Sequence, residues 1–228
     1  MRPVVFSYRW RRNPERLARV CASAGHVNNA REEERILRHL EHSPEENTID
    51  LCLVMGGFMD GILGRAYAIA EELPDILGPG FDIYYREHDE TASARRIVRI
   101  YGSCLRRIIL IGHSWGASSL VRDVIPFCAN VCVNGLITLD PVGIRRPKPL
   151  DSVMRWLNVY IPYAKAAWSR ENNIARLGRP WEYVPYAEDN NIPSSLRHSD
   201  AKGMFEEFGA PFARRIALEQ IFCEPKSL

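Results

Sequence analysis

Short apolar runs alternate with amphipathic segments along the chain from residue 49 onward. The run IDLCLVMGG, residues 49–57, ends in two glycines and is typical of a buried strand followed by a tight loop. In residues 91–105, apolar side chains recur at helical spacing and arginines occupy the positions between them. This pattern predicts an amphipathic helix whose arginines face solvent. Strands are predicted at 49–57, 81–87, 107–112, within 130–140 and at 155–162. Helices are predicted at 66–73 with Pro74 as its end, at 91–105, at 117–125, and in pieces from 200 or 201 to about 222.

The alternation of short strands with helical segments predicts an α/β fold. We expect a mostly parallel central sheet of about six strands, flanked by helices. Residues 163–193 are polar, aromatic and rich in asparagine. Residues 1–48 are expected to form an N-terminal extension that packs on the core, with a helix from about Glu32 to His42. Residues 49–228 then form the α/β domain.

The composition is that of a globular protein. Of the 228 residues, 46% are hydrophobic and 25% are charged, which excludes a wholly disordered or collagen-like chain. The formal net charge of +2 gives no argument for a nucleic-acid partner, and none is expected. No apolar run has the length of a membrane span, and the first residues lack the apolar stretch of a secretory signal.

The six cysteines lie mostly within apolar segments, where a thiol behaves as a small hydrophobic group. Cys128 and Cys132 form a C-x3-C pair, but no second Cys or His pair at a zinc spacing accompanies it, so no metal is expected. Reduced thiols and a cytoplasmic location are therefore expected. Export by a route that needs no signal stays open.

The sharpest chemical signal is the pentapeptide GHSWG, residues 112–116, which matches G-x-S-x-G. A predicted strand precedes it and a predicted helix follows it, which is the context that a nucleophile elbow requires. On such a turn the serine oxygen stands above the carboxyl end of the sheet, and only small neighbours let the strand and the helix approach. Ser114 is therefore the candidate nucleophile.

A serine nucleophile needs a base and an acid, and in this architecture they follow it in the order acid, then histidine. Of the six histidines, only His198 lies after Ser114 and outside the pentapeptide. Asp140 is the favoured acid, because it ends a predicted strand and so lies at the active edge of a parallel sheet. The alternative acid is Asp189, nine residues before the histidine. Weaker candidates are Glu182 and Glu188, and Asp123 on the following helix should point away.

The developing oxyanion of such a reaction needs two N–H donors. The residue after the nucleophile, Trp115, supplies one by its position. The other should come from the loop after the first predicted strand, GGFMDG at residues 56–61, whose glycines let backbone approach a substrate. The Phe58 N–H is favoured there, and Gly57 is the next candidate. An ordinary glycine turn is the alternative interpretation of this loop.

The segments VMGGFMDG, IGHSWGAS, LDPVG and RHSD, in that order, resemble the α/β-hydrolase superfamily over roughly residues 49–228. More narrowly, the chain resembles small bacterial lipase-like hydrolases. The resemblance implies a reduced α/β-hydrolase fold in which Ser114 attacks an ester or thioester carbonyl. It also implies His198 as general base, Asp140 as its orienter, and Trp115 and Phe58 as oxyanion donors, with no cofactor. The chain differs in having Met55-Gly56-Gly57 where the family usually has His-Gly.

The sequence leaves the substrate open. Residues 141–180 contain eight Lys and Arg but two Asp and Glu, which would suit an acyl ester or thioester with an anionic head, such as a phospholipid or an acyl-CoA. A solvated basic face is an equal explanation. Two other functions share the pattern: a non-catalytic binding module with this fold, and an acyltransferase with the same triad. Membrane contact has no support in the sequence, and the oligomeric state is open.

Overall fold

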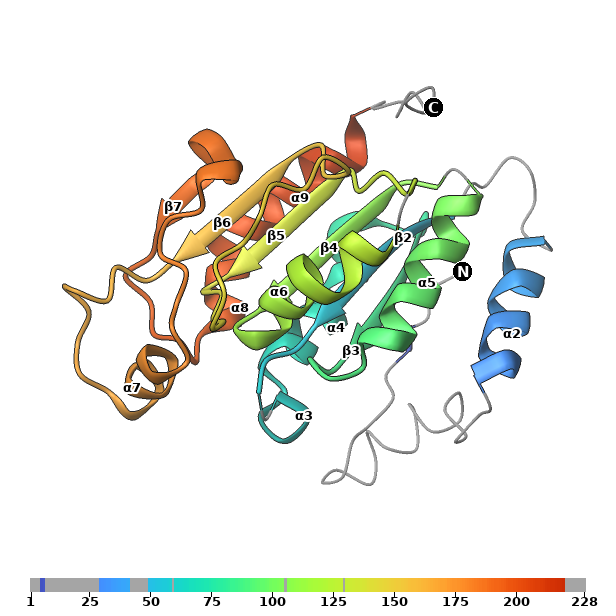
Figure 1. Ribbon diagram of the computed structural model, residues 1–228. Helices are drawn as coiled ribbons and strands as arrows, with labels where there is room; N and C mark the ends of the chain where they lie inside the picture. The colour runs from blue at the N-terminus through green and yellow to red at the C-terminus, as the bar shows by residue number, and fades with distance from the viewer. Residues whose placement is uncertain are drawn as a thin grey trace.

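A parallel β-sheet forms the centre of the molecule. A computed structural model describes residues 5–6, 29–41, 49–58, 60–104, 106–128 and 130–219 (Figure 1). Within these residues the sheet has seven strands, all parallel, in the order β1-β3-β2-β4-β5-β6-β7. The strands are β1 (Val5–Phe6), β2 (Asp50–Met55), β3 (Phe81–Arg86), β4 (Ile108–His113), β5 (Gly135–Leu139), β6 (Trp156–Tyr160) and β7 (Asn191–Pro193). The predicted α/β class with a parallel sheet is confirmed.

Helices cover both faces of this sheet (Figure 1). The helices α4, α8 and α9 contact one another on one face, and α2 packs on α5 on the other. The α-helices are α2 (Asn29–Glu41), α3 (Asp60–Leu63), α4 (Arg65–Leu77), α5 (Thr91–Ser103), α6 (Trp115–Ser119), α7 (Arg170–Leu177), α8 (Ala201–Met204) and α9 (Ala210–Leu218). The π and 3₁₀ segments are η1 (Leu120–Val124), η2 (Ile125–Phe127), η3 (Pro185–Asn190) and η4 (Phe205–Gly209).

The central strands are rich in apolar residues because both of their faces are buried. In β2, Leu51 and Leu53 pack in the core beneath α5, whereas Cys52 and Val54 pack in the core beneath α4. Successive side chains of a strand point to opposite faces, so one apolar run supplies both cores. This explains why the strand signal in the sequence is a continuous run rather than an alternation.

Two predicted helices differ from those in the structure. Pro74 does not end its helix, since α4 continues to Leu77. The proline lies in the last turn, where only one backbone hydrogen bond is lost, and Ile76 and Leu77 still pack against the core. The helix predicted at 117–125 starts directly after Ser114 as α6 and continues as η1 and η2.

The N-terminal segment and the region after β6 both contribute elements. The two residues of β1 pair with β3 and extend the sheet by one strand beyond the expected six. Helix α2 brings Ile36 and Leu40 into the core beside α5. The polar, asparagine-rich stretch 163–193 contains α7, η3 and β7. No helix of the described residues is both long and apolar enough to cross a membrane.

One of the described cysteines does not have the reduced thiol that the sequence predicts. Cys52, Cys104 and Cys128 are free thiols, but Cys132 is disulfide-bonded. The C-x3-C pair therefore does not share one chemical state. Burial raises the pKa of the Cys128 thiol, and the nearby Arg99 and Arg95 oppose this shift.

Candidate active site

Two residues with strained backbone stand side by side at the carboxyl edge of the sheet. Ser114 follows β4 with φ 54° and ψ −124°, and Asp140 follows the neighbouring strand β5 with φ 42°. A non-glycine residue at positive φ is uncommon and is often found at functional sites. Hydrogen bonds hold the two turns together, since the Ser114 N–H donates to Leu139 O at 3.0 Å and the Val142 N–H to Ser114 O at 3.2 Å.

Three glycines make the sharp turn at Ser114 sterically feasible. A Cβ on Gly112 would stand 2.5 Å from Ala117 Cα, and one on Gly116 would stand 2.4 Å from the carbonyl oxygens of Met55 and Gly56. A Cβ on Gly57 would lie 2.7 Å from Ser114 Cβ. The strand, the helix and the loop after β2 therefore meet at distances that only glycine allows, as expected of an elbow.

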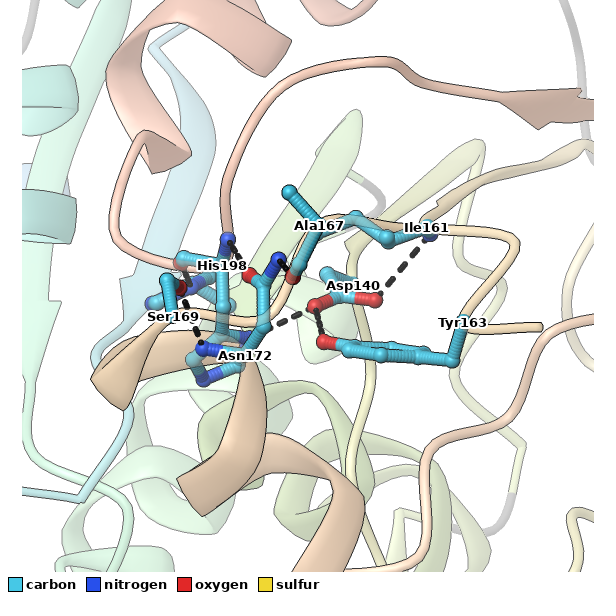
Figure 2. Close-up of polar contacts among 8 residues, drawn as sticks. Asp140, Ile161, Tyr163, Ala167, Ser169, Asn172 and His198 are labelled. Atoms are coloured by element: carbon cyan, nitrogen blue, oxygen red, sulfur yellow. Dashed lines mark hydrogen bonds and ion pairs between the residues drawn. The ribbon is translucent and has the colours of Figure 1, made fainter. Parts of the chain in front are cut away.

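The structure brings His198 and Asp140 together although 58 positions separate them. His198 Nδ1 lies 2.6 Å from Asp140 Oδ2, and both side chains are buried (Figure 2). Because the carboxylate accepts the proton on Nδ1, the Nε2 nitrogen of the neutral ring is left to accept another proton. This is the arrangement of a general base held by an orienting acid.

The carboxylate of Asp140 has two further donors (Figure 2). The backbone N–H of Ile161 donates to Oδ1 at 3.2 Å, and the Tyr163 hydroxyl donates to Oδ2. Burial raises the pKa of Tyr163, and the charge of Asp140 raises it further. The phenol therefore stays protonated and serves as a donor. Three donors therefore hold this buried carboxylate in one orientation.

Two neutral side chains fix the backbone of the histidine. The N–H of His198 donates to Asn172 Oδ1 at 3.0 Å, and Asn172 in turn donates to Ala167 O at 3.0 Å (Figure 2). On the other side, Nε2 of His113 lies 2.9 Å from His198 O and must be its donor. Burial lowers the pKa of His113 well below its usual range, and His198 adds to the effect. His113 is therefore neutral, with its Nδ1 buried and without a partner among the described residues.

Ser114 is linked to this pair through its neighbour His113. The rings of His113, the neighbour of Ser114, and His198 have centroids 5.0 Å apart, but Ser114 Oγ makes no hydrogen bond to His198 among the described residues. Such contacts are commonly loose before substrate binds.

The loop after β2 is anchored by a buried carboxylate that no motif or periodic pattern marks. Asp60 accepts the N–H groups of Arg65 at 2.9 Å and Ala66 at 3.0 Å, which begin α4, and the hydroxyl of Tyr85 at 2.6 Å. These hydrogen bonds of Asp60 therefore hold the end of the loop that leads into α3 and α4. Among the described residues, the N–H groups of Phe58 and Trp115 donate to no backbone acceptor.

The other acid candidates are not at the histidine in the described part of the chain. Glu182 Oε1 accepts the Tyr163 N–H at 3.2 Å, and Asp123 lies on η1 behind the elbow. The side chains of Asp189 and Glu188 lie outside the described residues, so the alternative acid stays a prediction. No group of three or more His, Cys, Asp or Glu among the described residues could hold a metal ion.

Comparison with known proteins adds little. No protein-family model matches the chain, and no curated protein matches it. One solved structure that it resembles is titled a "putative hydrolase of the alpha/beta superfamily", from Xanthomonas campestris pv. campestris. That match has 13% identity and a TM-score of 0.46, and it covers 73% of this chain and 98% of the other. A likeness of this degree carries no argument about activity.

Proposed function

We propose that this chain is a serine hydrolase that cleaves an ester or thioester bond through an acyl-enzyme. Ser114 is the nucleophile, His198 the general base and Asp140 the acid that orients it. The observation that carries the proposal is the 2.6 Å contact between His198 Nδ1 and Asp140 Oδ2, placed beside a serine at φ 54°. A strained serine, a buried acid and a histidine in this chain order have a common explanation in nucleophilic acyl transfer.

In the first half of the reaction, Ser114 Oγ attacks the carbonyl carbon while its proton passes to His198 Nε2. The carbonyl oxygen becomes an oxyanion that accepts the N–H groups of Trp115 and Phe58. The intermediate collapses, the bond to the leaving oxygen or sulfur breaks, and the leaving group takes the proton from His198. Water then repeats the sequence on the acyl-serine and releases the acid. These steps use only Ser114, His198, Asp140 and two backbone N–H donors, so the proposed mechanism calls for no cofactor.

Labelling with a fluorophosphonate probe tests the proposal, because the probe reacts only with an activated serine. We expect labelling of the wild type, loss of labelling in Ser114→Ala, and strong reduction in His198→Ala. The matched controls are Ser103→Ala, at an exposed serine that ends α5, and His39→Ala, at a half-exposed histidine of α2. Both should be labelled like the wild type.

The outcomes separate this proposal from its alternatives. A folded wild type that is not labelled would favour the non-catalytic binding module. Labelling with slow hydrolysis, but rapid turnover when an alcohol or thiol acceptor is added, would identify an acyltransferase. Turnover of both ester and thioester substrates in water, lost in Ser114→Ala by about 10⁴-fold or more, is the result we expect.

A further inference from the structure

Three aromatic rings meet beside the elbow, and we refer to Phe58, His88 and Trp115 as the aromatic trio. The rings of His88 and Trp115 stack with centroids 6.0 Å apart and planes 13° apart. The Phe58 ring meets both edge-on, at 5.9 Å from His88 and 5.8 Å from Trp115. Phe58 and His88 lie in the loops that follow β2 and β3, and Trp115 is the first residue of α6, after β4. Because β2, β3 and β4 are neighbouring strands, the aromatic trio connects two loops and the start of a helix.

Two members of the aromatic trio are the proposed oxyanion donors. The N–H groups of Phe58 and Trp115 belong to two separate segments of the chain. The distance between the two donors therefore depends on how these segments are positioned relative to each other. The Phe58 side chain is 57% exposed, and its ring has aromatic contacts only within the aromatic trio among the described residues. A mobile Phe58 would leave the oxyanion with one firmly placed donor.

The third member, His88, is rigidly supported. It sits in a turn closed by two hydrogen bonds, from Glu87 N–H to Glu90 Oε2 at 2.9 Å and from Glu90 N–H to Glu87 O at 3.0 Å. The carbonyl oxygen of Arg86, the last residue of β3, accepts the N–H of Gly56 at 2.9 Å. This hydrogen bond connects the start of the turn that holds His88 with the loop that holds Phe58. His88 Nδ1 is buried and without a hydrogen-bond partner among the described residues. Packing therefore holds the ring.

We propose that His88 is a positioning residue, whose ring sets the spacing of the Phe58 and Trp115 N–H groups by packing against both side chains. This inference rests on the proposed function. Stacked and edge-on aromatic pairs have defined geometry, so a ring fixed on the β3 turn restricts the two neighbouring rings. The restriction matters most in the transition state, where the oxygen carries its charge.

The test compares His88→Ala, which removes the ring, with His88→Phe, which keeps a flat ring but has no nitrogen. We expect His88→Ala to lower kcat for a short-chain ester by about 10- to 100-fold, less than the roughly 10²- to 10³-fold that loss of a whole donor costs. KM should stay within about 3-fold, because the ground-state carbonyl binds the donors weakly. His88→Phe should retain kcat within about 3-fold. His39→Ala is the control for removing a histidine far from the site.

A second readout keeps this inference separate from the proposed function. Hydrogen exchange of the peptide containing Phe58 should speed up in His88→Ala and return to the wild-type rate in His88→Phe. If the wild type is neither labelled nor active, the proposed function fails, but exchange still measures whether the ring holds the loop. Unchanged exchange and unchanged kcat in His88→Ala would overturn the inference. Equal losses in His88→Ala and His88→Phe would also overturn it, because the nitrogen rather than the ring would then matter.

Discussion

At Asp140, one oxygen serves two donors. Oδ2 accepts both the Nδ1–H of His198 and the hydroxyl of Tyr163. A second donor stabilises the charged carboxylate but weakens its attraction for the imidazolium that forms during the reaction. The Tyr163 hydroxyl thus holds the Asp140 carboxylate in place and weakens the electrostatic stabilisation that this carboxylate gives to protonated His198. Neither role was visible in the sequence, where Tyr163 was one aromatic residue among several.

The change Tyr163→Phe separates these roles. Without the hydroxyl, Asp140 interacts more strongly with protonated His198, so a higher pH is needed to free the base. We expect the acid limb of the kcat/KM profile to move to higher pH, with the plateau lowered less than about 10-fold. Tyr183→Phe, at an exposed tyrosine, should leave the profile in place. A profile that keeps its midpoint in Tyr163→Phe would show that the hydroxyl does not act on the acid–base pair.

The neutral His113 predicts how stability depends on pH. Burial lowers its folded-state pKa, so below the unfolded-state value of about 6.5 the unfolded chain binds a proton that the folded chain does not. Stability contributed by this residue is therefore complete above about pH 6.5 and is lost as the pH falls, by up to about 1.4 kcal/mol per pH unit. His113→Gln keeps an N–H donor for His198 O but does not titrate. The free energy of unfolding, measured with urea at pH values from 5 to 8, should depend less steeply on pH for this variant than for the wild type. The same pH dependence in both proteins would contradict the conclusion that His113 is buried in its neutral form.

At the scale of elements, the site depends on how closely β4, α6 and the loop after β2 approach. Gly116→Ala places a methyl group 2.4 Å from two carbonyl oxygens, and backbone cannot yield as a side chain can. We expect a loss of about 1–3 kcal/mol in the free energy of unfolding, as for other overpacked sites, together with loss of probe labelling. Gly80→Ala is the matched control, because its added methyl group would meet nothing within 4 Å. Equal stability of the two variants would contradict this account of the elbow.

The same elements show how far sequence reasoning extends. Ser114, His198 and Asp140 could be selected because local signals mark each one: a motif, a unique position after it, and the end of an apolar strand. The strands β2 to β6 follow from short apolar runs and most helices from apolar periodicity, whereas β1 and β7 are not predicted. Asn172 and Tyr163 could not be selected, since they reach the site through α7 and the loop before it, where no periodic pattern predicts an element. Asp60 contacts Tyr85, and His88 contacts Phe58 and Trp115. These partners are distant in sequence, and such contacts leave no local signal.

At the scale of the whole molecule, charge is unevenly distributed. The chain as a whole carries +2, yet residues 141–180 hold a clear excess of Lys and Arg. Two of these cations are engaged: Arg155 pairs with Glu219, and Arg176 packs over Tyr163 and donates to its carbonyl. Others are exposed on the segments that lead from Asp140 to α7 and beyond: Arg145, Arg146, Lys148, Lys165, Arg170 and Arg179. These segments lie between Asp140 and His198 in the sequence, and we expect their positive potential to act on a substrate that approaches the site.

An anionic ester or thioester substrate should benefit from this potential. Its encounter with the protein is steered by long-range attraction, which salt screens over about 10 Å at 0.1 M ionic strength. We expect kcat/KM for an anionic acyl substrate to fall several-fold between low and physiological ionic strength, mainly through KM, while a neutral ester of the same chain length changes little. The double variant Arg145→Gln/Arg146→Gln should reduce the salt dependence for the anionic substrate alone. Arg122→Gln, on η1, serves as the control for removing a cation elsewhere. Equal salt dependence for both substrates would mean that the basic segment is a solvated surface with no part in substrate selection.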